Sequence, residues 1–417
     1  MATPIWRSFP CKIAELRLDR TLACGQSFRW KEHSPGIWTG VIGCAVWQFK
    51  QTDSHLWYRV HKDVGHSKIT NIKMEADSNG VIENKTPVKS VKRKSGKRHG
   101  GTQNVETVKI KEELTCGIKE EVTSDIKTTN DRLDSVKDKF SNSSNDDERV
   151  LIDYFQLHVQ LEDLYKEWAK VDKHFETISK DFSGIRMLRQ NPVECLFSFI
   201  CSSNNHISRI SSMVEKLALH FGDQINLPYC VEGREFYTFP KVSALAADGV
   251  EEKLRDLGFG YRAKYIQKSA CYIVDNGDEN WLFKLKDMEY IEAKTHLMKL
   301  CGVGAKVADC VLLMCLDQPG SIPVDTHVWQ IAARDYIPKL NHAKSLTDKL
   351  YNEIGDYFRE LWGPYAGWAH SVLFTADLRQ FRNNELSNDK KGAKRKKYNS
   401  EESDVKVKVK AKKKKSL

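Results

Sequence analysis

The sequence has no apolar run long enough to cross a membrane, and its cysteines follow no regular spacing. The longest apolar run, Val311 to Leu316, is far shorter than the roughly 20 residues that a membrane-spanning helix needs. No charged-then-apolar leader opens the chain, so we expect no secretory signal. The 11 cysteines are scattered, which predicts reduced thiols in the cytosol, nucleus or mitochondrion rather than a disulfide framework.

Aromatic residues are almost missing from the segment 62–149, where Phe140 is the only one between Lys62 and Arg149. The segment is rich in charged residues, Ser, Asn, Thr and Gly, and such a composition cannot bury enough apolar area to offset chain entropy. We therefore expect a disordered insertion over 62–149. A small β-rich domain over 1–61 precedes it, and a mostly helical body over 150–380 follows.

The positive charge of the chain is unevenly distributed. The 417 residues carry a net charge of +10, but residues 381–417 hold 14 Lys and Arg against 5 Asp and Glu. This stretch is predicted to be a disordered basic tail, and the rest of the chain is nearly neutral. Bulk charge is therefore no argument that the folded part binds nucleic acid.

Hydrophobic patterning changes from strand-like to helical along the chain. Aromatic and β-branched runs over 38–42, 45–49 and 55–60 are separated by turn residues, which predicts an antiparallel meander. Helical spacing of apolar residues starts near Leu161, resumes after Pro192 and continues to about residue 380. The predicted fold class is α+β, with a small N-terminal antiparallel sheet and a mostly α-helical body.

The segment from Glu289 to Leu316 predicts two helices joined by a tight turn that contains Gly302 and Gly304. Glycines permit such a turn and a close approach of the backbone to a ligand. The second helix is expected to begin near Ala305, so its free N–H groups would face the turn and suit a DNA phosphate. A corner that needs glycine for its geometry alone is the alternative.

Lys306 favours a chemical role for this turn. A cation is misplaced in the first turn of a helix, where the dipole favours the deprotonated amine. A deprotonated lysine is a nucleophile that can form a Schiff base with a sugar C1′. Nineteen residues on, Asp325 fits an N-cap before a helix that opens at Thr326. Its carboxylate could also share one pocket with the amine and stabilise positive charge on a sugar ring.

Several separated motifs, taken together, resemble the helix-hairpin-helix glycosylase superfamily and, within it, the eukaryotic 8-oxoguanine DNA glycosylases. The resemblance covers roughly 1–60 and 150–380, and it implies a helix-hairpin-helix glycosylase body. The motifs that carry it are Cys24 to Trp30, Phe199 to Asn205, Leu257 to Ala263, Leu300 to Cys310, Pro323 to Trp329 and Trp362 to Trp368.

The resemblance implies a role for each matching residue. Lys306 would attack C1′ and go on to β-elimination, Asp325 would be the essential carboxylate, and His327 would lie near the backbone of the lesion strand. Phe374 and Cys310 would stack on the two faces of the flipped base, and the carbonyl of Gly25 would accept the N7–H of 8-oxoguanine. The residues expected to fill the gap in the duplex and contact the orphaned cytosine are Asn204, Arg209, Tyr261 and Arg262.

His370 stands where the familiar vertebrate enzymes have a glutamine facing the Watson–Crick edge of the lesion. A neutral imidazole offers one donor and one acceptor, and protonation removes the acceptor. We therefore expect base excision to weaken below about pH 6.5, the reference pKa of histidine.

The predicted activity is a bifunctional DNA glycosylase/lyase that excises 8-oxoguanine, and ring-opened oxidised purines, opposite cytosine. A monofunctional glycosylase for another damaged base and a non-catalytic DNA-binding module are the alternatives. No cofactor or metal is expected, because no cysteine follows Cys315 and the iron–sulfur branch needs four after the aspartate. The expected partner is duplex DNA that contains the lesion. The chain is expected to be a monomer and to bind no membrane.

The charged segments outside the resemblance predict localisation and modification. Lys394 to Lys397 and Lys412 to Lys415 are typical of nuclear import signals or of a non-specific DNA-binding arm, and a solvated basic tail is the alternative. We expect a nuclear protein that binds an import receptor, and the sequence leaves a mitochondrial pool open. Lys111 and Lys119 each lie in a hydrophobic-Lys-x-Glu pattern that resembles a sumoylation acceptor. A charged segment that matches by chance is the alternative.

Overall fold

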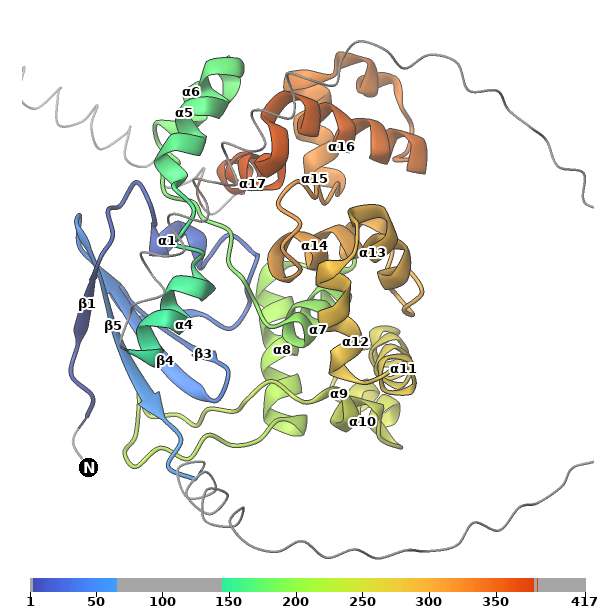
Figure 1. Cartoon of the computed structure of the whole chain (residues 1–417). Coiled ribbons are helices and arrows are strands. Elements are labelled where there is room, and N and C mark those ends of the chain that lie inside the picture. The colour runs from blue at the N-terminus through green and yellow to red at the C-terminus, as the bar shows by residue number, and fades with distance from the viewer. Residues whose placement is uncertain (1–2, 66–144, 379–380, 382–417) are drawn as a thin grey trace, which may run out of the picture. The chain divides into compact units, whose positions relative to one another are not determined.

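The computed structural model describes residues 3–65, 145–378 and 381 (Figure 1). These residues, apart from Gly65, belong to one compact unit. Most of the expected insertion and tail lies outside the described residues, and so do Lys111, Lys119 and the two basic runs of the tail.

A five-stranded antiparallel sheet forms the N-terminal part, in the order β1-β5-β4-β3-β2. The expected meander is confirmed, with Trp47 paired to Gly40 on one side and to Val60 on the other. The structure adds two edge strands that sequence patterning missed because each is only four residues long. The strands are β1 (Arg7–Pro10), β2 (Lys31–Ser34), β3 (Ile37–Ile42), β4 (Ala45–Gln51) and β5 (His55–Lys62).

The helix α4 (Asp146–Tyr154) begins inside the segment expected to be disordered, so that boundary is corrected. Asn145 caps the helix by accepting a hydrogen bond from the N–H of Asp147, and the Asp147 carboxylate pairs with Lys62 at 2.7 Å. Its first turn is acidic and resembles the polar segment before it. Acidic residues stabilise a helix N-terminus, and Leu151 then anchors the helix in the core under the sheet.

The remaining helices, apart from α1 between β1 and β2, follow the sheet and confirm the predicted change to helical structure. They are α1 (Leu18–Thr21), α5 (Leu161–Val171), α6 (Lys173–Ser179), α7 (Pro192–Ser202), α8 (Ile207–Phe221), α9 (Val242–Ala246), α10 (Val250–Asp256), α11 (Arg262–Asp275), α12 (Glu279–Lys284), η1 (Leu285–Asp287), α13 (Tyr290–Leu297), α14 (Ala305–Cys315), α15 (Thr326–Ile331), η2 (Ala332–Tyr336), η3 (Pro338–His342), α16 (Asp348–Trp362), η4 (Gly363–Tyr365) and α17 (Ala366–Asp377).

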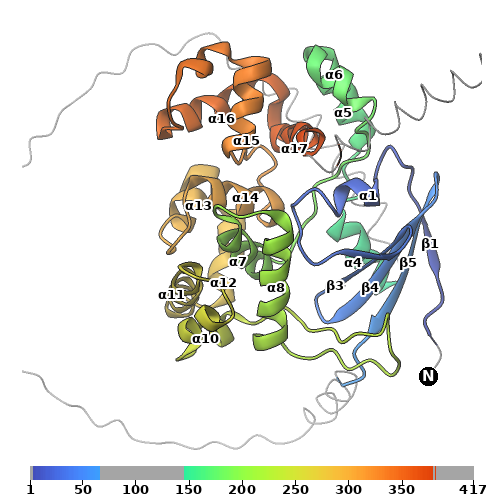
Figure 2. The ribbon, with the colours of Figure 1, turned by 180° about the vertical axis from the view of Figure 1, so that it is seen from behind.

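The helical body has two hydrophobic cores, and α14 contributes to both. One core joins α7, α8, α11, α13 and α14, and it includes Phe197 and Val311. The other joins α5, α6 and the helices from α15 to α17, and it includes Leu313 together with the stacked rings of Phe358 and Trp362. Both views show α14 between the two helix groups (Figures 1 and 2). Side chains on α14 can therefore face the boundary between the two groups.

The segment 222–240, which follows α8, reaches across to the sheet (Figure 2). Val231 and Phe236 pack against Val46 of β4. The carboxylate of Glu232 accepts a hydrogen bond from Gln48 at 2.8 Å and another from Thr39. These contacts tie the sheet to the helical body, so the loop between α1 and β2 has a fixed place beside the helices.

Phe381 packs into the core, although the predicted tail begins at this residue. It is 7% exposed, and its ring lies 4.5 Å from the Arg20 guanidinium carbon and 6.5 Å from the Phe182 ring. The folded body therefore extends to residue 381. An aromatic residue next to a basic tail has apolar area to bury, whereas its charged neighbours do not.

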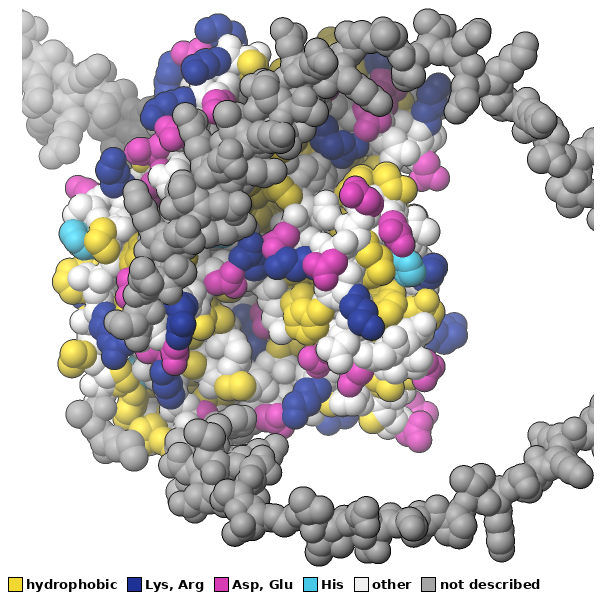
Figure 3. Space-filling model, viewed as in Figure 1, with side chains coloured by type: hydrophobic (Ala, Val, Ile, Leu, Met, Phe, Trp, Pro, Cys, Tyr) yellow, Lys and Arg dark blue, Asp and Glu magenta, His cyan; other side chains and the backbone are white. Residues whose placement is uncertain are grey.

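The surface of the described residues mixes charges of both signs. Lysine and arginine side chains alternate with aspartate and glutamate over the face shown in Figure 3, in line with the nearly neutral charge expected outside the tail. Within residues 3–65, 145–378 and 381, no helix is long and apolar enough to cross a membrane.

Candidate active site

The turn between α13 and α14 has the predicted hairpin geometry, and its two glycines have different tasks. Gly302 has φ +84°, and a Cβ there would lie 2.4 Å from the Tyr265 ring, so the fold itself requires this glycine. Gly304 is the N-cap of α14, has extended backbone and meets nothing within 4 Å at the Cβ position. The start of α14 is therefore open to a ligand at Gly304.

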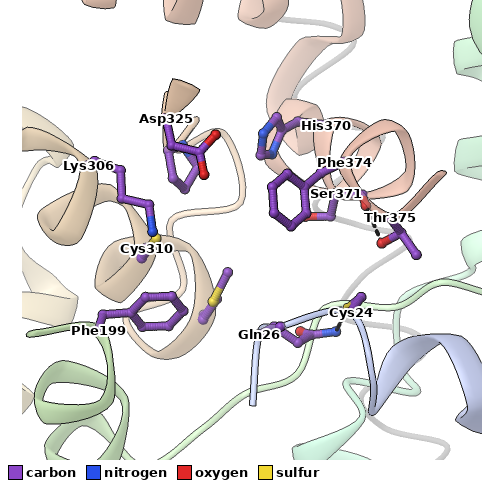
Figure 4. Close-up of a pocket in the computed structure, with 13 residues that line it drawn as sticks. Cys24, Gln26, Phe199, Lys306, Cys310, Asp325, His370, Ser371, Phe374 and Thr375 are labelled. Atoms are coloured by element: carbon purple, nitrogen blue, oxygen red, sulfur yellow. Dashed lines mark hydrogen bonds between the residues drawn. The ribbon is translucent and has the colours of Figure 1, made fainter. Parts of the chain in front are cut away.

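A cavity lies between α14, α17 and the loop that precedes β2 (Figure 4). It brings together six of the residues that the sequence singled out, from segments as distant in the chain as Gly25 and Phe374. The predicted residues that line it are Gly25, Lys306, Cys310, Asp325, His370 and Phe374. The residues that were not predicted are Cys24, Gln26, Phe199, Met314, Pro323, Ser371 and Thr375. Four of these, Cys24, Gln26, Phe199 and Pro323, stand within the quoted motifs, which is the signal that could have found them.

Lys306 lies half-buried in the first turn of α14, over an aromatic ring. Its Nζ is 5.1 Å from the centre of the Phe199 ring, and Phe199 meets Phe28 edge to face at 5.6 Å. Cys310 follows one turn later on α14. Burial raises the pKa of the Cys310 thiol to about 12, although the neighbouring Lys306 opposes the shift. Cys310 is therefore a neutral thiol near pH 7 and provides an apolar, polarisable surface.

Asp325 is both a helix cap and a lining residue of the cavity. As the N-cap of α15, its Oδ1 accepts hydrogen bonds from the N–H groups of His327 and Val328, each at 2.9 Å. The same carboxylate also lines the cavity that holds Lys306 (Figure 4). The cap fixes the orientation of the side chain, because two backbone donors hold one of its oxygens.

His370 is buried at the cavity wall and has unused hydrogen-bonding capacity. It is 7% exposed, and neither ring nitrogen has a partner among the described residues. Burial lowers its pKa from 6.5 to about 4, with Asp325 opposing the shift. The imidazole is therefore still neutral well below pH 6.5 and keeps its hydrogen-bond acceptor there. The expectation that it loses this acceptor near pH 6.5 is corrected. The Phe374 ring, one turn further along α17, lies 6.3 Å away.

The loop before β2 forms the floor of the cavity. Gly25 has φ +86°, and a Cβ there would lie 3.1 Å from the Ile207 side chain. Its neighbour Gln26 is buried and fixes the loop. The Gln26 amide donates to the carbonyls of Thr21 at 3.0 Å and Arg186 at 2.9 Å. The backbone of Gly25 is therefore presented to the cavity at a fixed position.

The residues expected to fill a gap in DNA gather outside the cavity, at the α7–α8 turn and the start of α11. Asn204 is exposed with φ +47°, and Tyr261 is 46% exposed. Arg209 is exposed and lies 3.5 Å from the Gly258 carbonyl. Arg262 is different, because it is 4% exposed and donates to the carbonyls of Ser203 and Asn204. Arg262 thus holds the turn that carries Asn204.

His327 is exposed at the start of α15, with its ring 6.3 Å from the ring of Phe374 at the rim of the cavity. Among the residues that the structure describes, no group of three or more His, Cys, Asp or Glu side chains is arranged to hold a metal ion. The arrangement therefore offers an amine, a carboxylate, an aromatic face and an unpartnered imidazole as its chemical groups.

Two family models match consecutive parts of the chain. The model described as "8-oxoguanine DNA glycosylase, N-terminal domain" matches residues 8–196, and the model described as "HhH-GPD superfamily base excision DNA repair protein" matches residues 197–356. The chain therefore carries an 8-oxoguanine DNA glycosylase N-terminal domain followed by an HhH-GPD base excision repair domain. The boundary between the matches falls within α7, so the family's N-terminal domain includes the sheet and the first helices of the body.

Two curated relatives are similar to this chain over more than half of its length. The N-glycosylase/DNA lyase OGG1 of Arabidopsis thaliana is 43% identical over 243 residues, 57% of this chain and 64% of the relative. The N-glycosylase/DNA lyase of Saccharomyces cerevisiae is 43% identical over 253 residues, 55% of this chain and 66% of the relative. The chain thus spans just under two thirds of the length of both.

Solved structures show the same fold. A structure of MBOgg1 in complex with a low affinity DNA ligand has a TM-score of 0.62 at 24% identity, covering 90% of this chain and 96% of that one. The 8-oxoguanine glycosylase/lyase of Clostridium acetobutylicum, in complex with double-stranded DNA containing cytosine opposite 8-oxoguanine, has a TM-score of 0.59 at 22% identity. That match covers 92% of this chain and all of the other. The α+β glycosylase fold expected from sequence is therefore confirmed.

Proposed function

We propose that this protein is a bifunctional DNA glycosylase/lyase that removes 8-oxoguanine, and ring-opened oxidised purines, opposite cytosine. One observation carries the proposal: the amine of Lys306 and the carboxylate of Asp325 come from the starts of two different helices and line one cavity. The relatives named N-glycosylase/DNA lyase support the reaction class, and the family supports the substrate class.

In the proposed reaction, the neutral amine of Lys306 attacks C1′ of the flipped deoxyribose. The bond between C1′ and the base breaks, and the base leaves with the bonding electrons and gains a proton. Loss of the ring oxygen from C1′ then gives a protonated Schiff base, from which β-elimination cleaves the strand. The Asp325 carboxylate stabilises the positive charge that develops on the sugar and assists proton transfer.

The cavity provides a surface for each part of a flipped oxidised purine. Phe374 and the neutral thiol of Cys310 line it from α17 and α14 and would stack on the two faces of the base. The fixed backbone of Gly25 would accept the N7–H that distinguishes 8-oxoguanine from guanine. The unpartnered nitrogens of His370 would meet the Watson–Crick edge, since buried polar groups otherwise lack compensation for lost water.

The exposed residues outside the cavity would contact the duplex. The start of α14 at Gly304 suits a phosphate because no side chain caps it and the Cβ position is empty. Asn204, Arg209 and Tyr261 would fill the gap and contact the orphaned cytosine. Extruding the nucleotide costs a few kcal/mol, which these contacts would offset. We also propose nuclear localisation and import, with sumoylation at Lys111 and Lys119, on the sequence patterns alone.

Borohydride trapping on a duplex with 8-oxoguanine opposite cytosine tests the proposed chemistry. The wild-type protein should form a covalent adduct with the DNA, and Lys306→Gln should abolish it. The matched control is Lys170→Gln, which removes an exposed lysine of α5 and should leave the adduct unchanged. Base release without an adduct would instead identify a monofunctional glycosylase, and binding without base release would identify a DNA-binding module.

A further inference from the structure

A buried carboxylate one turn after Lys306 joins the two helices of the hairpin. Asp309 lies on α14 and is fully buried. From α13, the Tyr290 hydroxyl donates to its Oδ1 at 2.8 Å, and the Lys294 ammonium donates to its Oδ2 at 2.8 Å. The Lys294 side chain is 12% exposed, so this is a largely desolvated ion pair.

The same carboxylate also binds the loop 321–324, which leads into Asp325. The Ser321 hydroxyl donates to its Oδ1 at 2.9 Å, and the hydroxyl of Tyr351, from α16, donates to its Oδ2. That hydroxyl in turn accepts the N–H of Val324 at 3.4 Å, and Val324 immediately precedes Asp325. A chain of hydrogen bonds therefore runs from α14 through Tyr351 to the residue before the catalytic carboxylate.

The other side of the loop is also constrained. The Gly367 N–H donates to the Pro319 carbonyl at 2.8 Å, and a Cβ on Gly367 would lie 2.4 Å from the Ser321 carbonyl. The loop is thus packed between α17 and the hydroxyls that bind Asp309. Burial raises the pKa of Tyr351 far above its ordinary value, so its hydroxyl stays protonated and remains a donor.

We propose that Asp309 is a positioning residue for the reaction, holding the loop 321–324 so that the Asp325 carboxylate keeps its place relative to the Lys306 amine. The inference rests on the proposed function. Burying a carboxylate costs desolvation energy even when it has four donors. Its presence is therefore weak evidence that it stabilises the fold. Its four donors come from three separate segments, all around the helix that carries the nucleophile. Small displacements of reacting groups, about 1 Å, can slow an enzyme by about 10²-fold.

Two tyrosine variants separate positioning from stability. Tyr351→Phe removes the hydroxyl between Asp309 and the loop, whereas Tyr290→Phe removes one hydroxyl from the same carboxylate on the hairpin side. Each variant is measured as a full chain for single-turnover base excision at saturating enzyme, for the apparent KM and for thermal stability. We expect Tyr351→Phe to lower the single-turnover rate by about 10-fold or more, with KM nearly unchanged. Tyr290→Phe should keep the wild-type rate even if its stability falls equally.

Each combination of measured rates either supports or overturns the positioning role of Asp309. Equal rates in the two tyrosine variants, whether both wild-type or both reduced, would overturn it, because Asp309 would then be structural only. If Tyr351→Phe does not fold, Ser321→Ala removes a different hydroxyl between Asp309 and the loop. A reduced rate in Ser321→Ala supports positioning, and a wild-type rate overturns it. A wild-type protein that releases no base would overturn the proposed function as well, so the two failures are distinguishable.

Discussion

The amine of Lys306 lies 5.1 Å from the centre of the Phe199 ring, over a side chain that is itself 2% exposed. An aromatic face attracts a cation, and the interaction is stronger where water is excluded. The protonated Schiff base proposed for this enzyme keeps a positive charge at the same nitrogen. The Phe199 ring should therefore stabilise the covalent intermediate more than it stabilises the neutral amine that attacks.

Replacing Phe199 with leucine should slow formation of the trapped adduct. Loss of a cation–π contact of about 0.5–2 kcal/mol corresponds to a rate roughly 2–30-fold lower. Single-turnover borohydride trapping measures the effect. The matched control is Phe197→Leu, which removes an equally buried ring of α7 from the same core. Equal trapping rates in the two variants, at similar stability, would show that the ring acts only by packing.

Asp325 combines a helix cap with the proposed catalytic charge, and two substitutions separate the two roles. Asparagine can still accept the N–H bonds of His327 and Val328, so Asp325→Asn should unfold within a few tenths of a kcal/mol of the wild type. Alanine loses the cap as well and should cost about 1 kcal/mol more. Both should lower base excision by about 10²-fold or more. Chemical denaturation gives the stabilities, and near-normal excision by Asp325→Asn would refute the role of its charge.

The two glycines of the hairpin should respond differently to alanine. Gly302→Ala forces a side chain to a positive φ and into the Tyr265 ring, which should cost more than about 2 kcal/mol of stability. Gly304→Ala meets open space and should cost no more than about 1 kcal/mol, the scale of a cap change. Its methyl group would stand at the proposed phosphate site, so duplex affinity measured by fluorescence anisotropy should fall. Unchanged affinity would place the phosphate elsewhere.

The features that sequence alone predicted are local ones. The hairpin, the start of α14 and the Asp325 cap depend on neighbouring residues, and six of the residues that line the cavity were named from the family's motifs. Sequence missed what depends on distant partners. The burial of Arg262 follows from the carbonyls of the α7–α8 turn. The donors to Asp309 come from residues between 290 and 351 and show no pattern along the chain.

The ends of the folded segments were also predicted wrongly, again for physical reasons. The strands β1 and β2 are short and lie at the edges of the sheet, where alternation of apolar and polar residues is weak. The acidic first turn of α4 resembles the polar segment before it in composition. Amino-acid composition indicates whether a segment can bury apolar area. It does not indicate at which residue helix capping and ion pairing begin.

His370 should reduce acid stability without limiting catalysis near neutral pH. Its pKa is about 4 in the folded protein and about 6.5 in the unfolded chain, so the unfolded chain binds more protons between these values. Stability must then fall as the pH drops through this window. From pH 7 to pH 5 the wild type should lose about 2 kcal/mol more free energy of unfolding than His370→Gln. Urea denaturation at the two pH values measures this difference.

The control for this experiment is His220→Gln, which removes an exposed histidine at the end of α8 and should follow the wild type at both pH values. Because the His370 imidazole is already neutral at pH 5, the pH profiles of base excision by the wild type and His370→Gln should have the same shape between pH 5 and 8. A wild-type rate that falls near pH 6.5, with no such fall in His370→Gln, would show that the ring titrates in contact with water. The cavity would then be open enough to hydrate the imidazole.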